Sequence, residues 1–324
     1  MSHAIRFHHT GGPDVLQFET VEPAPPGPGE VRLHQHAIGL NYIDTYHRSG
    51  LYPVPLPSGI GQEGAGVVEA VGEGVTELAV GDRVAYAGGP LGAYAETRNI
   101  DAGLLVRLPD AISFEQGAAM MMQGLTAQYL LRSTYPVQAG ETVLVHAAAG
   151  GVGSIMVQWA KALGATVIGT VGSDAKADKV RALGCDHAIV YTREKFPERV
   201  REITGGAGVP VVYDSIGKDT FLDSLACLRR RGLMVSYGNA TGPVPPFECA
   251  LLMKMGSLYV TRPTLFDYIA DRRELLERAA ELFEVVASGK VRVEIGQRFA
   301  LREAAEAHRA IEARRTVGST VLLP

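Results

Sequence analysis

The sequence predicts an α/β protein with two domains, a β-rich domain and a doubly wound domain built on a parallel sheet. The chain has 324 residues, 46% of them hydrophobic and 20% charged, which is long enough for two hydrophobic cores. Short β-type runs broken by glycine fill residues 30–99. From residue 142 to residue 237, apolar runs alternate with helical stretches, which is typical of a parallel sheet covered by helices on both faces.

The β-rich part begins with an alternating strand. Val31, Leu33 and Gln35 alternate with arginine and histidine residues, which predicts one inward face. Turn signals recur about every ten residues, which favours small twisted sheets or a partial barrel. The segment after Arg262 is helical, and the chain then returns to β-like runs near "TVGSTVLLP". We expect this tail to rejoin the first domain.

The parallel-sheet part is predicted from five apolar strand candidates separated by helical stretches. They are "TVLVHA", "TVIGTV", "HAIVY", "VPVVYDSIG" and "GLMVSYG". The segment "GSLYVTRP", residues 256–263, is the predicted last strand of this sheet. An apolar edge strand that is left open invites pairing with a second copy, so we expect a homodimer.

The stretch "HAAAGGVG", residues 146–153, lies between a predicted strand and a helix predicted over residues 151–163. Ala148, Gly150 and Gly153 have the spacing of a dinucleotide-binding loop, with alanine in the first place. Gly150 lets the backbone approach a pyrophosphate, and Gly153 lets the helix pack on the strand. The start of the helix presents N–H groups to the phosphates. We therefore expect a dinucleotide here; the alternative is a purely structural glycine turn.

The residues after the second strand of this domain bear on which dinucleotide is bound. Enzymes that prefer the unphosphorylated coenzyme usually carry Asp or Glu at that strand's tip, about 20 residues beyond the loop. The tip here is Gly172, followed by Ser173 and Lys176, a hydroxyl and a cation suited to a 2′-phosphate. The alternative is that Lys176 is only a solvated lysine. We expect Asp174 to cap the next helix with its side chain turned inward; the other possibility is that it binds a ribose hydroxyl.

Composition excludes several classes of partner. The formal net charge is -4 with no block of like charges, so we expect no nucleic-acid partner and no membrane partner. The three cysteines are too scattered for a disulfide framework or a four-thiolate metal site, and they suit a reducing cytosol. No secretory signal is visible at the start. We expect a cytoplasmic protein with a small-molecule substrate.

Six stretches together carry a family resemblance. They are "AAAGGVG", "GLNYIDTYHRSGLYP", "GIGQEGAGVVEAVGEGV", "VYDSIG", "RRGLMVSYGN" and "GSLYVTRP". Over essentially its whole length the chain resembles the zeta-crystallin-like NADPH:quinone oxidoreductases of the medium-chain dehydrogenase/reductase superfamily. The resemblance implies a GroES-like catalytic domain at residues 1–124, completed by residues 265–324, and a Rossmann dinucleotide-binding domain at residues 125–264. It also implies subunits paired as homodimers.

The same resemblance bears on metal. Zinc alcohol dehydrogenases of this superfamily carry Cys-x-x-Asp and Gly-His-Glu where this chain has Asn41 to Asp44 and Gly61 to Glu63. Asn41 and Gln62 thus replace two ligands by neutral amides, which are poor partners for Zn²⁺, and the cysteine-rich structural zinc loop is missing. We therefore expect no metal. The histidines, His34, His36 and His47 among them, are expected on the surface or in the core.

Without a metal, the reaction needs an acceptor that takes hydride readily, and a quinone is one. The resemblance implies direct transfer from NADPH with no flavin. It places Asn41 at the nicotinamide, and it places Tyr46 and Tyr52 in the quinone pocket, where either could donate a hydrogen bond to the developing oxyanion. The alternative is that both tyrosines only pack the mouth of the cleft.

The resemblance also implies a set of coenzyme-binding residues. It places Thr126 near the nicotinamide, Gly151 and Val152 at the pyrophosphate beside Gly150 and Gly153, Ser173, Lys176 and Tyr191 around the 2′-phosphate, and Ile216, Tyr237, Gly238, Arg262 and Arg314 elsewhere in the site. Ile216 and Tyr237 follow predicted strands, so they should lie at the carboxyl edge of the sheet. Gln123 stands where related reductases can have lysine, and it bears on substrate preference if it faces the cleft.

Two other functions stay open at this point. The first is an NADPH-dependent enone or enoyl-thioester reductase, because hydride addition to a conjugated carbonyl is similar chemistry. The second is a non-catalytic NADPH-binding protein, as crystallin-like relatives are in the lens. Some such relatives are proposed to bind RNA, but the net charge of -4 without a basic stripe argues against RNA here. Oxidation of NADPH with a panel of quinones and enones separates these readings.

Overall fold

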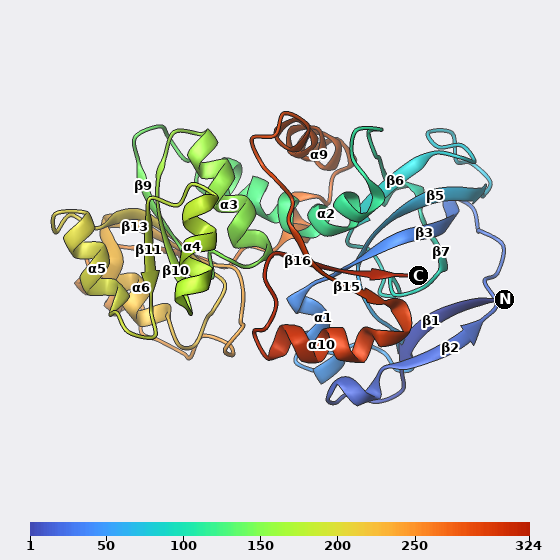
Figure 1. Cartoon of the computed structure of the whole chain (residues 1–324), viewed down its shortest axis with the longest axis horizontal. Helices are drawn as coiled ribbons and strands as arrows, with labels where there is room; N and C mark the ends of the chain where they lie inside the picture. The colour runs from blue at the N-terminus through green and yellow to red at the C-terminus, as the bar shows by residue number, and fades with distance from the viewer. The chain divides into compact units, whose positions relative to one another are not determined.

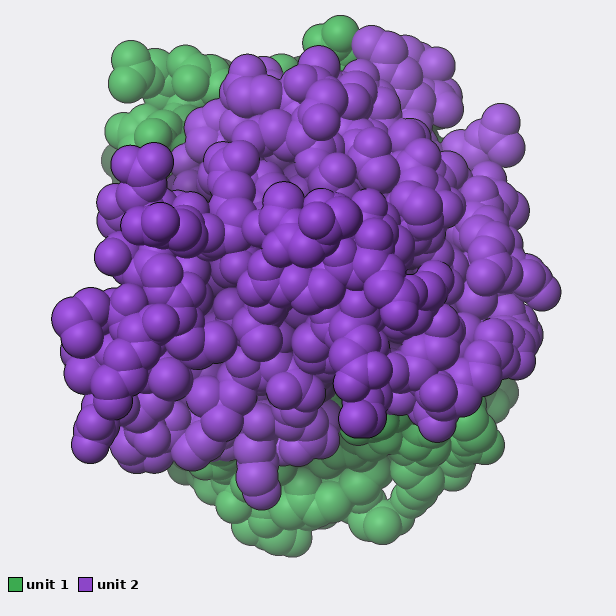
Figure 2. Space-filling model, turned by 90° about the vertical axis from the view of Figure 1, so that its left-hand side faces the viewer, with its two compact units in different colours: residues 1–125, 271–287, 293–324 green, residues 126–270, 288–292 purple.

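The structure is a computed structural model, and it describes residues 1–324. The chain divides into two compact units. The first comprises residues 1–125, 271–287 and 293–324, and the second comprises residues 126–270 and 288–292. Figure 2 colours the two units separately. Each unit has its own hydrophobic core.

The first unit is rich in β-structure. Its strands are β1 (Ser2–Phe7), β2 (Gln17–Val21), β3 (Glu30–Leu40), β4 (Ser58–Gly59), β5 (Glu63–Val71), β6 (Arg83–Ala87), β7 (Thr97–Asp101), β8 (Val106–Arg107), β15 (Ile295–Ala300) and β16 (Ser319–Leu323). Its helices are α1 (Tyr42–Ser49), α9 (Arg272–Ala287) and α10 (Ala304–Glu312), with short turns η1 (Pro13–Val15), η2 (Ala102–Leu104) and η4 (Leu301–Glu303).

Two sheets hold this unit together. A three-stranded sheet has the order β2-β1-β4, and a seven-stranded sheet has the order β15-β16-β3-β5-β6-β8, with β7 also paired to β3. The C-terminal strand β16 runs antiparallel to β3, with Thr320 opposite Leu40, and Figure 1 shows the two side by side. The predicted alternation of β3 is confirmed, because Val31 and Leu33 are buried while His34 is exposed.

The second unit alternates strands and helices. Helix α2 (Phe114–Tyr129) starts in the first unit and ends in the second, followed by η3 (Leu130–Thr134). The strands are β9 (Thr142–Val145), β10 (Thr166–Val171), β11 (His187–Val190), β12 (Val209–Asp214), β13 (Leu228–Ser236) and β14 (Tyr259–Thr261). The helices are α3 (Gly151–Ala162), α4 (Asp174–Ala182), α5 (Phe196–Ile203), α6 (Phe221–Cys227), α7 (Ala250–Lys254) and α8 (Leu265–Tyr268).

The strands of the second unit form one six-stranded sheet in the order β11-β10-β9-β12-β13-β14, and every neighbouring pair is parallel. Helices α3 to α6 lie against this sheet (Figure 1). The chain winds outward from β9 in one direction and then from β12 in the other, so the predicted doubly wound sheet is confirmed. In such sheets ligands bind beyond the carboxyl ends of the strands, where the order reverses.

Burial explains why these segments form strands. The inner strands of the second unit are continuous apolar runs, and Leu144, Ile168, Val212 and Met234 belong to one core cluster. The predicted last strand is the short β14 at the edge of the sheet, where Tyr259 is 61% exposed. None of the helices is both long and apolar enough to cross a lipid bilayer.

Candidate functional site

The candidate residues fall into two clusters, one in each unit, and we describe each cluster separately. In the second unit, the loop after β9 leads into α3. Gly150 is the residue before the first turn, and no side chain caps this helix end. The first N–H groups of an α-helix have no partner within the helix, so they are available to an anion. Gly150 N donates to Ala147 O at 2.9 Å, which closes the loop into a tight turn.

Gly153 is fixed by close approach. A Cβ at this position would lie 2.3 Å from Ala147 O and 2.8 Å from Ala148 Cα, so any side chain would push α3 away from the loop. Ala147 itself has a left-handed backbone, with φ of 49°. The structure thus places Gly150, Gly151, Val152 and Gly153 together at one helix start, as the spacing predicts.

A series of hydrogen-bonded, buried side chains starts from His146, the residue at the beginning of this loop. His146 Nδ1 is 2.8 Å from Thr170 Oγ1, and His146 Nε2 is 2.9 Å from Ser224 Oγ. The Ser224 hydroxyl donates onward to Asp214 Oδ2 at 3.0 Å. Because the Ser224 proton is used on Asp214, the serine oxygen must accept from His146 Nε2–H, and His146 Nδ1 must accept from Thr170. Burial lowers the pKa of His146, which favours this neutral tautomer.

Asp214 fastens the loop after β12. Its carboxylate accepts from Ile216 N at 2.7 Å, Gly217 N at 3.1 Å and Thr220 Oγ1 at 2.7 Å, in addition to Ser224. The side chain is fully buried, so these four donors replace the water it has lost. Asp214 therefore links the loop that carries Ile216 to the histidine that begins the dinucleotide loop.

The loop after β13 is tied to the same edge. Tyr237 N donates to Asp214 O at 2.8 Å, and Ala240 N donates to Ser215 O at 3.2 Å. A Cβ on Gly238 would lie 2.5 Å from Ser215 O, so only glycine permits this approach. Ile216, Tyr237 and Gly238 thus gather at the carboxyl edge of the sheet, as expected.

The residues after β10 differ from the prediction in one respect. Ser173, and not Asp174, caps α4, and its Oγ accepts from Lys176 N at 3.4 Å. The inward-turned Asp174 is therefore a wrong expectation, because Ser173 already has the extended backbone that a cap needs. The Tyr191 hydroxyl lies 2.8 Å from where a Gly172 Cβ would stand. Gly172, Ser173, Lys176 and Tyr191 thus belong to one corner of the sheet edge.

Sequence reasoning missed one charged residue at this corner. Arg193 Nη1 contacts Asp174 Oδ2 at 2.5 Å, and both side chains are exposed. The sequence signal that points to Arg193 is the pairing of β10 with β11. In a parallel sheet, residues that follow neighbouring strands lie beside one another, and Arg193 follows β11 as Asp174 follows β10.

The cluster in the first unit centres on Asn41. A directed chain of donors runs through its amide: Ser319 Oγ donates to Gln123 Oε1 at 2.6 Å, Gln123 Nε2 to Asn41 Oδ1 at 3.3 Å, and Asn41 Nδ2 to Glu63 Oε2 at 2.5 Å. All four side chains are buried. The chain fixes which end of the Asn41 amide is nitrogen. Gln123 is thus a hydrogen-bond partner of Asn41 in this structure.

Glu63 is a second residue that sequence reasoning quoted but gave no role. Its Oε1 accepts from Met122 N at 2.8 Å while Oε2 accepts from Asn41. Complete burial raises the pKa of Glu63 to about 8, against the opposing effect of these hydrogen bonds. The carboxyl group is therefore an anchor between α2 and the residue before α1.

Asp44 anchors Asn41 from the other side. Its Oδ2 accepts from Asn41 N at 2.9 Å and from the Tyr94 hydroxyl at 2.9 Å. In return, Asp44 N donates to the backbone oxygen of Asn41 at 3.0 Å, which closes the first turn of α1. Oδ1 is buried without a partner, and burial raises the pKa of Asp44 to about 7.

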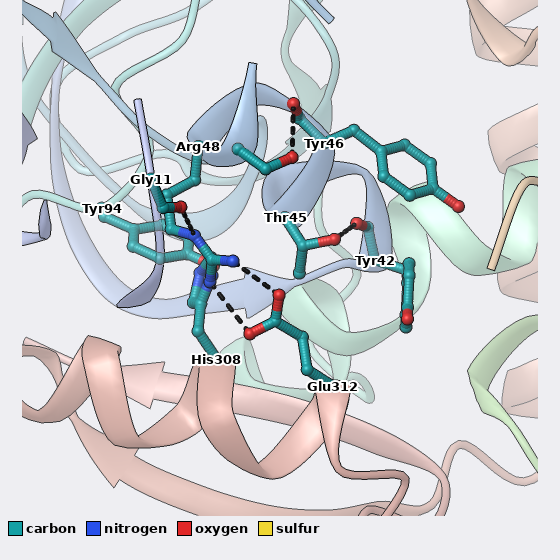
Figure 3. A network of polar contacts seen from close by, with 9 residues as sticks. Gly11, Tyr42, Thr45, Tyr46, Arg48, Tyr94, His308 and Glu312 are labelled. Atoms are coloured by element: carbon teal, nitrogen blue, oxygen red, sulfur yellow. Dashed lines mark hydrogen bonds and ion pairs between the residues drawn. The ribbon is translucent and has the colours of Figure 1, made fainter. Parts of the chain in front are cut away.

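Buried Arg48 is linked to Asp44 through His308 and Tyr94. Figure 3 shows Arg48, His308 and Tyr94 together with Glu312 and Gly11. Arg48 Nη1 lies 3.1 Å from His308 Nδ1, and His308 Nε2 lies 3.2 Å from the Tyr94 oxygen. Arg48 also donates to Gly11 O at 3.0 Å and to Glu312 Oε1 at 2.5 Å. Burial and the arginine lower the pKa of His308 to about 3, so this ring stays neutral. The network joins α1 to α10.

The predicted tyrosines Tyr46 and Tyr52 contact each other. Their rings lie edge to face with centroids 5.2 Å apart, and Tyr52 N donates to Tyr46 O at 3.1 Å. The Tyr46 ring points away from Arg48 in Figure 3. The structure therefore brings the two predicted tyrosines together, at the C-terminal half of the helix that Asn41 begins.

The remaining predicted residues are more scattered. Thr126 is buried on α2 within the second unit. Arg262 is exposed directly after β14, and its Nη1 donates to Pro263 O at 3.1 Å. Arg314 is exposed after α10 in the first unit, with a left-handed φ of 56°. Arg314 and Asn41 thus belong to the first unit, and the other coenzyme candidates belong to the second.

Known protein families match most of both units of the chain. The alcohol dehydrogenase GroES-like domain family matches residues 27–110, and the zinc-binding dehydrogenase family matches residues 151–284. A quinone oxidoreductase of Pseudomonas aeruginosa is 58% identical, and the match covers 100% of both chains. The chain belongs to the quinone oxidoreductase family. The resemblance seen in the sequence is thereby confirmed, and with it the GroES-like and Rossmann-like fold class.

Two further members sharpen the comparison. The solved structure of the Escherichia coli quinone oxidoreductase complexed with NADPH is 52% identical, covers 100% of both chains and has a TM-score of 0.98. The 2-haloacrylate reductase of a Burkholderia species is 49% identical, over 99% of this chain and 98% of the relative.

One of the two matched families is named for zinc binding, but the residues of this chain do not suit a zinc ion. Asn41 and Gln62 offer amides, and both amide nitrogens are already donors, to Glu63 and to Gly89 O at 2.8 Å respectively. Thiolate or neutral imidazole is what Zn²⁺ prefers in such positions. No three His, Cys, Asp or Glu side chains gather in an arrangement that could hold a metal ion. His34 and His36 are exposed, and His47 is buried on α1.

Proposed function

We propose that this chain is a zinc-independent oxidoreductase that transfers hydride from NADPH directly to a quinone. The observation that carries the proposal is the likeness, over both full lengths, to a quinone oxidoreductase solved with NADPH. The chemistry of the two clusters supports it. One cluster offers a helix start and cations for a phosphorylated dinucleotide, and the other offers a fixed amide and, on the helix that follows it and just after that helix, two phenols.

The second unit fits NADPH on its own evidence. The uncapped start of α3 suits a pyrophosphate, and Gly153 leaves no Cβ to separate helix from loop. Gly172 leaves the ribose position uncharged, while Lys176 offers a cation to a 2′-phosphate. NADPH, when bound, supplies the hydride. Ile216, Tyr237, Gly238, Thr126, Arg262 and Arg314 keep their proposed contacts with the coenzyme.

We assign the quinone substrate and the nicotinamide group of the coenzyme to residues of the first unit. Asn41 is proposed to orient the nicotinamide with an amide that Glu63 and Gln123 prevent from flipping. Tyr46 and Tyr52 are proposed to hydrogen-bond the quinone oxygens, because a phenol can stabilise the negative charge that develops there. A quinone needs no metal for this step, since the charge spreads over its aromatic ring.

One assay tests the proposal. Purified protein is mixed with NADPH and a series of quinones, and NADPH oxidation is followed by absorbance. We expect quinone-dependent oxidation that is faster with NADPH than with NADH. Binding of NADPH with no turnover of any quinone or enone would instead identify a coenzyme-binding protein without this activity.

A second candidate is favoured by one relative. The 2-haloacrylate reductase is 49% identical over nearly the full length, and its substrate is an electron-poor alkene conjugated to a carboxyl group. The same clusters could serve reduction of such an alkene, or of an enone, by NADPH. A ratio of kcat/KM values that favours 2-haloacrylates or enones over every quinone would select this function.

We further propose a homodimer in the cytoplasm. Strand β14 is one of the two edge strands of the six-stranded sheet; Tyr259 on this strand is 61% exposed, and Met253 on the preceding helix α7 is 67% exposed. The three cysteines are free thiols, as in a reducing compartment. Light scattering at working concentration should give twice the 34.5 kDa chain mass; a monomer contradicts the dimer.

A further inference from the structure

We propose that Arg193 is a further residue that selects the phosphorylated coenzyme, and that Asp174 controls how tightly it does so. This inference rests on the proposed function, because it deepens the coenzyme site. Neither residue belongs to the set that the family resemblance implies. The evidence is the position of Arg193, its contact with Asp174 and the charges at this corner.

Arg193 follows strand β11, which is the neighbour of β10 in the sheet. Val171 is the register partner of Val190 in the parallel pair β10 and β11. Beyond these residues the two strands stay in contact, since Tyr191 N donates to Val171 O at 3.1 Å and Thr192 Oγ1 to Gly172 O at 3.5 Å. Residues 191–193 form a turn at the end of β11, in which Arg193 N donates to Val190 O at 3.1 Å, and this turn contacts residues 172–174, where a coenzyme of this fold places its adenosine ribose.

The contact itself is an exposed ion pair. Arg193 Nη1 lies 2.5 Å from Asp174 Oδ2, and the side chains are 54% and 68% exposed. A pair this exposed contributes little to folding stability, because water and salt screen it. The pair can therefore open at little cost to folding stability. The guanidinium has five donors in a planar fork, and the contact with Asp174 uses one of them.

The opposite charges of Arg193 and Asp174 determine how the pair responds to a bound phosphate. Asp174 stands in the first turn of α4, beside the residues expected to bind the 2′-phosphate, and an unpaired carboxylate there would repel it. Arg193 offsets that charge. A phosphate carries about 1.5 to 2 negative charges near neutral pH and accepts two parallel N–H bonds from arginine. It should therefore draw the guanidinium away from the single carboxylate.

Two consequences follow, and they have opposite signs. Loss of Arg193 removes a phosphate donor and also leaves Asp174 unpaired, so affinity for the 2′-phosphate falls. Loss of Asp174 releases Arg193 and removes a repelling charge, so affinity rises. Because each residue acts through the other, the cost of Arg193→Ala should differ between the wild type and a chain that already carries Asp174→Ala, in which no carboxylate is left unpaired.

The test compares two probes that differ only in the 2′-phosphate. Dissociation constants of adenosine 2′,5′-bisphosphate and adenosine 5′-monophosphate are measured by calorimetry for the wild type, Arg193→Ala, Asp174→Ala and the double variant. We expect Arg193→Ala to weaken the bisphosphate about tenfold, the scale of one charge-assisted contact, and Asp174→Ala to tighten it several-fold. The monophosphate should change for neither.

Arg181→Ala is the matched control. Arg181 pairs with Asp178 at 2.9 Å, and it is 50% exposed, but it lies in the last turn of α4. It should leave both dissociation constants unchanged. If the wild type prefers the bisphosphate and Arg193→Ala weakens both probes equally or neither, the inference is wrong and the proposed function stands. If the wild type does not prefer the bisphosphate, the proposed coenzyme and this inference fail together.

Discussion

Asn41 Nδ2 donates to Glu63 Oε2 at 2.5 Å, and both side chains are buried. The Glu63 carboxyl group accepts on both oxygens, from Asn41 and from Met122 N. This relationship sets the direction of the Asn41 amide, the residue that we assign to the nicotinamide. We therefore predict that the reaction rate depends on the Glu63 carboxyl group, which acts by orienting Asn41.

Glu63→Gln tests this dependence. The new amide must turn its NH₂ group toward either Asn41 or Met122, so one donor faces another donor. An unsatisfied buried group costs about 1–3 kcal/mol, and we expect kcat to fall by roughly tenfold or more. Affinity for adenosine 2′,5′-bisphosphate should not change. Glu69→Gln, at an exposed position on the same strand β5, is the control, and an unchanged kcat in Glu63→Gln would contradict the role.

The buried carboxyl groups also predict how stability depends on pH. Burial raises the pKa of Asp44 to about 7 and that of Glu63 to about 8, from reference values of 3.8 and 4.5. At a pH between the reference pKa and the folded pKa, each carboxyl group is protonated in the folded chain and ionised in the unfolded chain. The free energy of unfolding should therefore fall as pH rises, between about 4 and about 7 for Asp44 and between about 4.5 and about 8 for Glu63.

Asp44→Asn separates this effect from loss of the hydrogen bonds that Asp44 accepts. The asparagine oxygen can replace Oδ2 as acceptor for Asn41 N and Tyr94, while its NH₂ group takes the place of the unpartnered Oδ1. Denaturant unfolding at pH 5, 6, 7 and 8 should show a shallower fall in the variant. The same slope in both proteins would mean that Asp44 does not keep its proton on folding.

Coenzyme choice gives the third prediction. A charge-assisted contact between Lys176 and the 2′-phosphate should be worth about 1.5 to 3 kcal/mol, or one to two decades in affinity. Lys176→Ala should raise KM for NADPH by that factor and leave KM for NADH nearly unchanged. Gly172→Asp should go further, because its carboxylate repels the phosphate and displaces the Tyr191 hydroxyl, 2.8 Å from the new Cβ. Equal effects on both coenzymes would refute the assignment.

Ser224 gives the fourth prediction. It stands between His146 and Asp214, so Ser224→Ala leaves His146 Nε2–H and one Asp214 lone pair without partners. We expect the free energy of unfolding to fall by about 1–3 kcal/mol. Because the chain joins two coenzyme loops, KM for NADPH should rise while KM for the quinone stays constant. A loss below about 0.5 kcal/mol, the usual effect of a surface change, would show that the chain is not needed.

Much of the fold and part of the site follow from local sequence signals. The strand–loop–helix around Gly150 and the apolar strands were predictable because periodicity and glycine spacing are local. The roles of Glu63 and Asp214 were not, because each depends on which donors the folded chain brings to a buried carboxylate. Asp174 was mistaken for a helix cap because Ser173, its neighbour, is an equally good cap by residue type. Arg193 became visible only through the register of β10 with β11.

The measurement that tests the account most directly is steady-state NADPH oxidation in the presence of a quinone, by protein whose metal content has been determined. Activity is measured before and after dialysis against a chelator, and with NADPH and NADH at equal concentration. We predict quinone-dependent oxidation that favours NADPH and is unaffected by the chelator. One zinc per chain whose removal abolishes activity, or no oxidation with any quinone, would contradict the account.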